Sequence, residues 1–460
     1  MQTIKSVYFI GAGGIGMSAL ERYFLSQSLF VGGYDRTETP LTKELIREGA
    51  DIHYTDDVDA IPQACRDPQT TLVVYTPAVP KDHRELTWFR QAGFEVKKRA
   101  EVLGYLTRQM KGLCVAGTHG KTTTTAMAAH LLHESHVGCN AFLGGIAKNY
   151  ATNYLLDNNS DFVVIEADEY DRSFHHLQPY ASVITATDPD HLDIYGTEEA
   201  YLESFTHYTS LIRPDGALIV HKDLKFKEAL PVGTRRFDYG RDAGNFHAEN
   251  IRIGGGRVCF DLISPLGNIS EIELGVPVSI NIENGIAAIA LAQIAGATPD
   301  EIREGMKTFQ GVDRRFDFKI KSDKVVLLSD YAHHPTEVRQ SILSVREVFN
   351  GRRIIGIFQP HLYTRTRDFY REFAESLSLM DEVILLDIYP ARELPIEGVS
   401  SKLIYDHLRA DMKKHLCDKS ALLPLLKQEE TDVVMVLGAG DVDAMVPQIA
   451  QMLKEKYNII

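Results

Sequence analysis

The chain has 460 residues, of which 44% are hydrophobic, 24% charged and 9% aromatic, and these proportions exclude a disordered or fibrous protein. Its length favours three domains, because a domain usually has about 100 to 200 residues. The formal net charge of -14 excludes a general nucleic-acid binder, since such proteins neutralise phosphates with clustered Lys and Arg side chains.

The N-terminal part alternates apolar, strand-like runs with helix-length stretches, which is typical of a parallel α/β domain. Helices are predicted near residues 16–29 and from Leu41 onward. The predicted strands are residues 6–10, 30–35 and 71–76. This pattern indicates a Rossmann-like domain, which we place at residues 1–108.

The alternation continues through the middle of the chain, with a helix predicted from Lys121. Its predicted strands are residues 113–118, 161–168, 181–187 and 216–220. Between about residues 232 and 280, short strands and turns predict antiparallel β structure appended to this domain. We place this central domain, which resembles a P-loop ATPase, at residues 109–318.

A third α/β region follows, and we place it at residues 319–460. Its predicted strands are residues 325–330, 353–360, 382–389 and 432–440, each followed by a helical stretch. The predicted fold class is therefore α/β with three domains: Rossmann-like, P-loop ATPase-like with appended β structure, and a C-terminal Rossmann-like domain.

The five cysteines, at positions 65, 114, 139, 259 and 417, are odd in number and widely spaced. No CxxC pair is present, so neither a disulfide framework nor a zinc site is predicted. No export signal precedes the first strand, and no apolar run approaches the roughly 18 residues of a membrane span. We expect a cytoplasmic protein with no membrane partner and no nucleic-acid partner.

A first glycine loop follows the first predicted strand and opens a helix. It contains Gly11, Gly13, Gly14 and Gly16, and Asp35 ends the next strand nineteen positions later. This spacing is typical of a site where backbone N–H groups at a helix start face a nucleotide diphosphate. NAD and a UDP-sugar both fit, and the alternative is a turn that only packs strand against helix.

A second glycine loop, with the sequence GTHGKT, also joins a strand to a helix. It supplies a lysine for the β/γ-phosphates of ATP and a hydroxyl for Mg²⁺. It departs from the common P-loop, which has glycine where Val115 stands. The predicted ATP-binding residues of this loop are Gly117, Thr118, His119, Gly120, Lys121, Thr122 and Thr123.

Two phosphate loops in successive domains predict two phosphorylated ligands, one of them ATP. An NAD-dependent oxidoreductase would need only the first loop, so that alternative requires a regulatory role for ATP. A nucleotide-binding module without catalysis is a third possibility, and it predicts no magnesium-dependent turnover.

The strings GTHGKTTTT, EADEYDRSF, HLQP, DHLD, DYAHHPTE and FQPHLYTRTRDF occur in the order found in the Mur ligases of peptidoglycan synthesis. The chain resembles this family over essentially its whole length. The resemblance implies that ATP converts a carboxylate to an acyl phosphate, which an amine attacks to give a tetrahedral intermediate. Such chemistry depends on charge neutralisation and positioning.

Within the family, the GVDRRFD string and Phe205 favour the branch that joins L-alanine to UDP-N-acetylmuramate. Phe205 stands where later-acting members carry a metal-binding carbamylated lysine. The alternative within the family is a ligase that adds a murein tripeptide to the same nucleotide sugar. The oligomeric state, monomer or homodimer, stays open.

The resemblance also implies roles for single residues. The catalytic set is Lys121, His361 and Arg365. The metal set, for Mg²⁺ or Mn²⁺, is Thr122, Glu166 and His191. Further ATP contacts are Asn281, Asn284, Arg314, Asp330 and His333. The alanine set is Tyr331, His361 and Arg365. The UDP-N-acetylmuramate set is Gly11, Gly13, Gly14, Gly16, Asp35, Thr76, Arg99 and His119.

Two positions depart from the family pattern. Ile280 stands where the family usually has histidine beside Asn281, which affects the adenosine contact. Leu362 stands where the family tends to have arginine, so Arg365 or Arg367 must hold the carboxylate of alanine. Because the ligands are divided among three domains, we also expect the domains to close on substrate binding.

Overall fold

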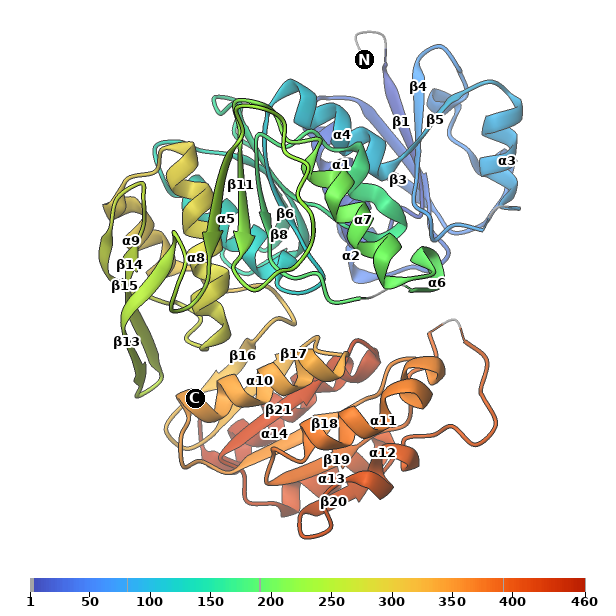
Figure 1. Cartoon of the computed structure of the whole chain (residues 1–460). Coiled ribbons are helices and arrows are strands. Elements are labelled where there is room, and N and C mark those ends of the chain that lie inside the picture. The colour runs from blue at the N-terminus through green and yellow to red at the C-terminus, as the bar shows by residue number, and fades with distance from the viewer. Residues whose placement is uncertain (1–3, 81, 190–191, 392, 460) are drawn as a thin grey trace. The chain divides into compact units, whose positions relative to one another are not determined.

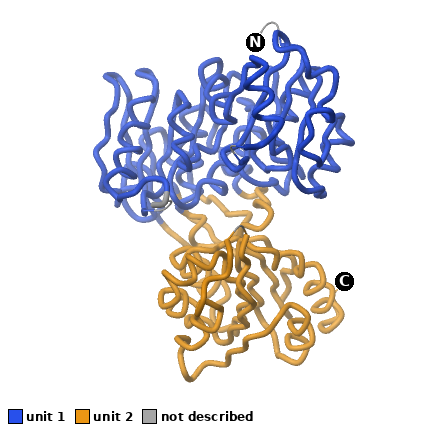
Figure 2. Tube along the Cα trace, turned by 90° about the vertical axis from the view of Figure 1, so that its right-hand side faces the viewer, with its two compact units in different colours: residues 1–249, 262–270, 283–306 blue, residues 250–261, 271–282, 307–460 orange. Residues whose placement is uncertain are grey.

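The structure is a computed structural model that describes residues 4–80, 82–189, 192–391 and 393–459, and Figure 1 labels its helices and strands. The chain divides into two compact units (Figure 2). Unit 1 contains residues 1–249, 262–270 and 283–306, and unit 2 contains residues 250–261, 271–282 and 307–460.

The N-terminal sheet has five parallel strands in the order β3-β2-β1-β4-β5. Its strands are β1 (Ser6–Ile10), β2 (Phe30–Tyr34), β3 (Asp51–His53), β4 (Thr71–Tyr75) and β5 (Glu95–Lys98). Its helices are α1 (Ile15–Ser26), α2 (Pro40–Glu48), α3 (Arg84–Gln91) and α4 (Arg99–Gln109). Strand β1 is fully buried, because Val7 and Phe9 pack with α1 and α4 while Tyr8 and Ile10 pack with α3.

The central sheet has seven strands in the order β12-β11-β10-β6-β9-β7-β8. They are β6 (Lys111–Ala116), β7 (Asn140–Ala147), β8 (Thr152–Leu155), β9 (Phe162–Glu166), β10 (Ala181–Ile184), β11 (Ala217–His221) and β12 (Arg235–Tyr239). Its helices are α5 (Lys121–His133), α6 (Leu192–Tyr195) and α7 (Glu198–Thr209). Among the described residues of this sheet, only β8 runs antiparallel to its neighbour, β7.

The prediction of antiparallel β structure from about residue 232 was wrong for its first strand. Strand β12 pairs parallel to β11 and extends the main sheet. A separate three-stranded sheet follows, made of β13 (His247–Gly254), β14 (Arg257–Ile263) and β15 (Ile269–Glu273), and then α8 (Ile280–Ala295) and α9 (Pro299–Thr308). The short sequence of β12 does not indicate whether it pairs parallel or antiparallel, because strand direction depends on the connection that returns the chain to the sheet.

The C-terminal sheet has six strands in the order β16-β17-β21-β18-β19-β20. They are β16 (Asp317–Lys321), β17 (Val326–Asp330), β18 (Ile354–Phe358), β19 (Glu382–Leu385), β20 (Lys413–Leu416) and β21 (Val433–Leu437). Its helices are α10 (Pro335–Val348), α11 (Tyr363–Leu377), α12 (Lys402–His407), α13 (Lys419–Gln428) and α14 (Val446–Tyr457). Helices α13 and α14 share one core with the sheet, and Phe358 packs on Phe373 of α11 at 5.2 Å between ring centres.

The predicted α/β fold class is confirmed, with three large sheets in the predicted order along the chain and the three-stranded sheet between the second and the third. Unit 1 holds two of these sheets because one hydrophobic core runs from β1 into the central sheet, with Phe9 and Ile165 among its members. The residue bounds of the three domains stay a prediction. The expected boundary at residue 318 falls inside β16.

Among the described residues, none of the helices has the length and apolar character that a bilayer crossing requires. The five cysteines all lie in the described part of the chain and are free thiols.

Candidate functional site

The first glycine loop lies between β1 and α1, at the carboxyl ends of the parallel strands. Gly11 has a φ of +90°, and a side chain there would meet Thr76 Cγ2 at 2.8 Å. A Cβ on Gly16 would lie 1.7 Å from Arg99 Nη1. The structure therefore brings Thr76 and Arg99 to this loop, and only glycine leaves room for them.

Asp35 and Arg99 are both engaged by groups of the protein itself. Asp35 accepts hydrogen bonds from the backbone N–H groups of Gly13 at 2.7 Å and Thr37 at 3.0 Å. Arg99 forms an ion pair with Asp168 at 3.4 Å. In this arrangement Asp35 holds the loop closed, and Arg99 links the loop to the segment that follows β9.

The second glycine loop lies between β6 and α5. Gly117 and Gly120 have φ values of +128° and +78°, which favour glycine. Thr118 donates its N–H to Ala186 O at 3.0 Å, and the Thr185 hydroxyl donates to His119 O. Thr185 and Ala186 were not predicted from the sequence. They directly follow β10, and their small side chains could have indicated that the backbone there lies close to the glycine loop.

Lys121 opens α5 and points back into this loop. Its Nζ donates to Gly117 O at 2.6 Å and to Glu169 Oε1 at 3.0 Å. Burial opposes its charged form, but the carboxylates of Glu169, Glu166 and Asp168 outweigh that effect and raise the pKa of Lys121. Lys121 is therefore positively charged at neutral pH, and hydrogen bonds to Gly117 and Glu169 fix the position of its ammonium group. Glu169, only 2% exposed, is its main partner and was not singled out from the sequence.

Thr122 and Glu166 form the described part of the predicted metal set. The Thr122 hydroxyl lies 3.2 Å from Glu166 Oε1, while the buried Glu166 Oε2 has no hydrogen-bond partner among the described residues. A Cβ on Gly144 would meet that oxygen at 2.0 Å, so glycine in β7 leaves it room. A hydroxyl beside a buried carboxylate oxygen fits Mg²⁺. His191 lies outside the described residues.

Other residues expected near ATP have varied surroundings. His119 lies 3.6 Å from a carboxylate oxygen of Asp188. Asn284 lies against the ATP loop, since its Oδ1 accepts from Thr124 at 3.3 Å and would meet a Cβ on Gly120 at 2.8 Å. Asn281 is buried and donates its side-chain amide to Val276 O at 3.2 Å. Thr123, unlike its neighbours Thr122 and Thr124, is only partly buried.

In unit 2, Asp330 ends β17 and His333 precedes α10. Burial raises the pKa of Asp330 to about 6, although Ser341 donates a hydrogen bond to its carboxylate. Burial lowers the pKa of His333 to about 4, although Glu337 lies 3.2 Å from its Nδ1. His333 is therefore neutral at pH 7, with Nδ1 also 3.0 Å from Tyr331 O.

We expect Asp330 to make stability fall as the pH rises. Its pKa is about 6 in the folded chain and about 3.9 in an unfolded one. The folded state therefore binds this proton more tightly, and the resulting stabilisation, about 2 to 3 kcal/mol, is full below about pH 4 and lost as the pH passes about 6. Urea unfolding across this range should show that the free energy of unfolding of the wild type falls by that amount relative to Asp330→Asn, which has no carboxyl to titrate at this position. A constant difference would contradict the shift.

His361 lies in the turn between β18 and α11, and Arg365 lies in the first turn of α11. The His361 ring stacks on Tyr389 at 5.8 Å and lies 6.0 Å from His333. Burial and the Arg365 cation lower the pKa of His361. The Arg365 side chain makes no hydrogen bond or ion pair with any described residue, whereas Arg367 pairs with Asp368 at 2.7 Å. Of the two arginines expected to compensate for Leu362, Arg365 is the one left available.

The turn before α11 has a strained backbone, and it is hydrogen-bonded to residues about 30 positions later in the chain. Leu362 has a φ of +72°, which is unfavourable for a residue with a side chain. Its N–H donates to Tyr389 O at 3.0 Å, and Glu393 accepts the Thr364 N–H at 3.0 Å. Tyr389 and Glu393 were not predicted, because nothing in their local sequence marks them as neighbours of residues 361–365.

Two arginines flank the Tyr331 ring, at 4.7 Å for Arg314 and 4.9 Å for Arg315. Arg314 also donates to Gly440 O at 3.0 Å and lies 3.3 Å from Asp443. The Arg315 side chain makes no hydrogen bond to a described residue. Arg315 is thus better placed than Arg314 to give its donors to a phosphate.

Phe205, which replaces the expected lysine, is fully buried against Phe174 and Tyr201, at 5.2 and 5.3 Å between ring centres. It belongs to the core of the central domain. Ile280, the other departure in this part of the chain, begins α8 and is partly buried.

Three segments match the parts of one family. Residues 6–111 match the catalytic domain of the Mur ligase family, residues 115–292 the Mur ligase middle domain, and residues 314–440 the glutamate ligase domain of Mur ligases. The chain is also 66% identical over 456 residues to the UDP-N-acetylmuramate--L-alanine ligase of Phocaeicola vulgatus, covering 99% of this chain and 100% of that protein.

Two solved structures are similar over nearly the whole chain. The UDP-N-acetylmuramate-alanine ligase MurC of Thermotoga maritima has a TM-score of 0.81 and 28% identity, covering 98% of this chain and 99% of that one. The murein peptide ligase Mpl of Psychrobacter arcticus has a TM-score of 0.66 and 20% identity, covering 99% of both chains, a level that shows the fold alone.

Proposed function

The chain belongs to the Mur ligase family, and on that premise we propose that it joins L-alanine to the lactyl carboxylate of UDP-N-acetylmuramate. ATP is consumed, and the products are UDP-N-acetylmuramoyl-L-alanine, ADP and phosphate. The observation that carries the proposal is the 66% identity, across 99% of the chain, to a relative named for this reaction.

The first step transfers the γ-phosphoryl group of ATP to the lactyl carboxylate. A new bond forms between the carboxylate oxygen and phosphorus, and the bond to the β-phosphate oxygen breaks, so ADP leaves. The ammonium group of Lys121 and the N–H groups at the start of α5 stabilise the negative charge on the phosphoryl group during its transfer. Thr122 and Glu166 would hold Mg²⁺, which neutralises phosphate charge when bound.

The second step is attack of the amine of alanine on the acyl carbon. The tetrahedral intermediate collapses with loss of phosphate, which leaves the amide. Arg365, whose guanidinium has no ion-pair partner among the described residues, binds the carboxylate of alanine. His361 is neutral at pH 7 because its pKa is lowered, so it can accept the proton that the amine loses.

The nucleotide sugar binds at the first glycine loop. The N–H groups at the start of α1 and the guanidinium of Arg99 offer donors to the diphosphate. Arg99 is held by Asp168 in this arrangement and exchanges that partner for phosphate oxygens. Thr76 contributes a hydroxyl at the end of the neighbouring strand.

The proposal is tested by phosphate release. We expect release that requires both UDP-N-acetylmuramate and L-alanine, with glycine and L-serine used less well. The loss of one methyl group is worth roughly 10- to 200-fold in specificity, so glycine should fall in that range if Leu362 has not loosened the pocket. Coupled phosphate detection gives kcat/KM for each amino acid.

The same panel separates the alternatives. A preference for L-Ala-γ-D-Glu-linked tripeptide would overturn L-alanine as the acceptor, and phosphate release that ignores both substrates would overturn the ligase. A binding module without catalysis would show no magnesium-dependent turnover at all.

A further inference from the structure

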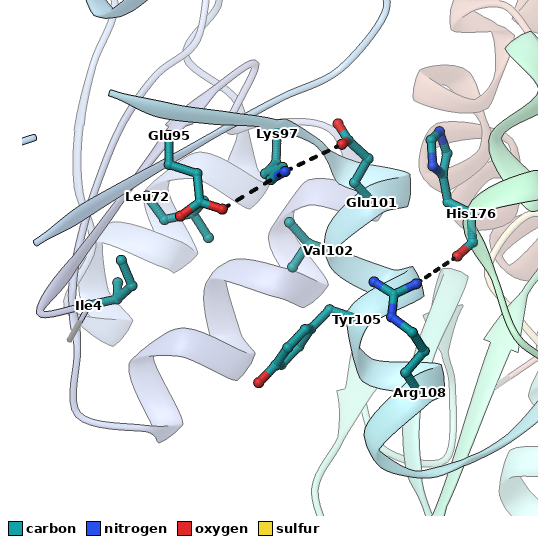
Figure 3. A pocket seen from close by; sticks show the side chains of 9 residues that line it. All are labelled: Ile4, Leu72, Glu95, Lys97, Glu101, Val102, Tyr105, Arg108 and His176. Atoms are coloured by element: carbon teal, nitrogen blue, oxygen red, sulfur yellow. Dashed lines mark hydrogen bonds and ion pairs between the residues drawn. The ribbon is translucent and has the colours of Figure 1, made fainter. Parts of the chain in front are cut away.

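A pocket of about 290 Å³ lies in unit 1, away from the glycine loop of the same sheet (Figure 3). It is lined by Leu72 and Glu95, near the starts of β4 and β5, and by Ile4, just before β1. The glycine loop follows the last residue of β1. Because the strands are parallel, the pocket is at the amino ends of the sheet and the diphosphate loop at its carboxyl ends.

Both apolar and charged side chains line this pocket, and Glu95 lies beside Leu72 (Figure 3). Its apolar wall is made of Ile4, Leu72, Val102 and Tyr105, whereas Arg108 lies beside His176, across the group from Ile4 and Leu72 (Figure 3). The volume is at the lower end of the range for small-molecule sites. The shape therefore suits a small molecule with an apolar body and a polar end.

The cations of the pocket differ in how they are paired. Lys97 lies between Glu95 at 3.9 Å and Glu101 at 3.7 Å. Arg108 makes one hydrogen bond, to His176 O at 3.4 Å, and pairs with no carboxylate among the described residues. A planar guanidinium with unused donors favours a carboxylate, which it can bind with two parallel hydrogen bonds. The two nearby glutamates disfavour a more highly charged anion.

Helix α4 connects this pocket to the diphosphate loop. It begins at Arg99, which lies over Gly16, and its later turns carry Val102, Tyr105 and Arg108. The helix is also clamped onto the segment Tyr170–His176. A Cβ on Gly104 would lie 2.2 Å from His176 O.

The clamp continues at the start of α4, where Lys98 pairs with Asp171 at 2.6 Å. Asp171 closely follows Glu166 and Glu169, which contact Thr122 and Lys121 of the ATP loop. A molecule held between Arg108 and the apolar wall would therefore brace α4 in the position where Arg99 is paired with Asp168.

We propose that this pocket is an effector site for a small apolar monocarboxylate, and that its occupant weakens binding of the nucleotide sugar by holding Arg99 on Asp168. The regulatory part rests on the proposed function of the glycine loop. The binding part does not, because it can be measured without turnover.

The probe is 3-phenylpropanoate, followed by ligand-observed NMR or calorimetry on the full chain. We expect one bound molecule per chain and binding that is about tenfold weaker for Arg108→Gln, the scale of a charge-assisted pair. The neutral amide of the same acid should be weaker by a similar factor. Arg47→Gln is the matched control, because Arg47 is an exposed arginine of the same sheet's α2 with no contact to the pocket.

Equal binding of acid and amide, or no binding at millimolar concentration, would overturn the site. For the coupling, the probe should raise the KM for UDP-N-acetylmuramate about fivefold in the wild type and leave it unchanged in Arg108→Gln. UDP-N-acetylmuramate must in turn weaken the probe by the same factor, and binding without this reciprocal effect would overturn the regulation. A chain without ligase activity that still binds the acid through Arg108 would contradict the proposed function and leave the site standing.

Discussion

Replacing Lys121 with alanine is expected to lower kcat for phosphate release by roughly 10³-fold, the scale of losing one charged group that stabilises a transferring phosphoryl group. Lys121 is the cation that the structure holds in the second glycine loop, between Gly117 O and Glu169. The loss should appear in kcat, because the charge on the phosphoryl oxygens is redistributed during the transfer. Single-turnover phosphate release measures it directly.

The control addresses folding, because the substitution leaves the buried carboxylate of Glu169 without its cation. An unpaired buried charge costs about 3 to 5 kcal/mol of stability. The double variant Lys121→Ala/Glu169→Gln removes both charges and should recover thermal stability but not activity. A double variant with kcat within tenfold of the wild type would show that Lys121 is not part of the reaction.

Replacing Glu166 with glutamine should raise the Mg²⁺ concentration for half-maximal activity by about 10- to 100-fold and lower kcat as well. The change keeps the side chain's size but removes the negative charge beside Thr122, whose hydroxyl lies 3.2 Å away. Excess Mg²⁺ should restore part of the activity, because a weaker site fills at a higher concentration. Activity is measured against Mg²⁺ at saturating ATP.

Asp171→Asn is the matched control, since Asp171 lies in the same acidic string but pairs with Lys98. Its Mg²⁺ dependence should equal that of the wild type. Equal shifts in both variants would mean that general negative charge, and not the Glu166 carboxylate, supports the metal.

The two glycine loops were predictable from sequence because each is a local feature. A strand, a turn that needs glycine and a helix start occupy consecutive positions, and the backbone N–H groups they expose follow from chain geometry. The loop itself predicted a hydroxyl for Mg²⁺, which Thr122 supplies, whereas Glu166 was predicted as its partner only through the resemblance to the Mur ligases. The two residues are 44 positions apart, and adjacent strands β6 and β9 bring them together.

Asp35 shows a second limit of prediction from sequence, which concerns the hydrogen-bond partner of a side chain. Its spacing from Gly16 predicted a contact with the nucleotide, which stays a prediction, and the structure adds that it accepts the N–H of Gly13. Spacing places a carboxylate beside a loop without showing which donor it accepts, since the backbone amides compete with the ligand for the same oxygens.

Periodicity and turn residues were thus enough to predict three α/β sheets, two phosphate loops and a chain of ordinary globular type, because those signals come from neighbouring residues. Only the tertiary structure shows that Glu169 holds Lys121, that Arg365 rather than Arg367 is unpaired, and that β12 runs parallel to β11. Each of these depends on contacts between segments distant in sequence, and the packing that selects such partners leaves no mark in the local pattern of residues.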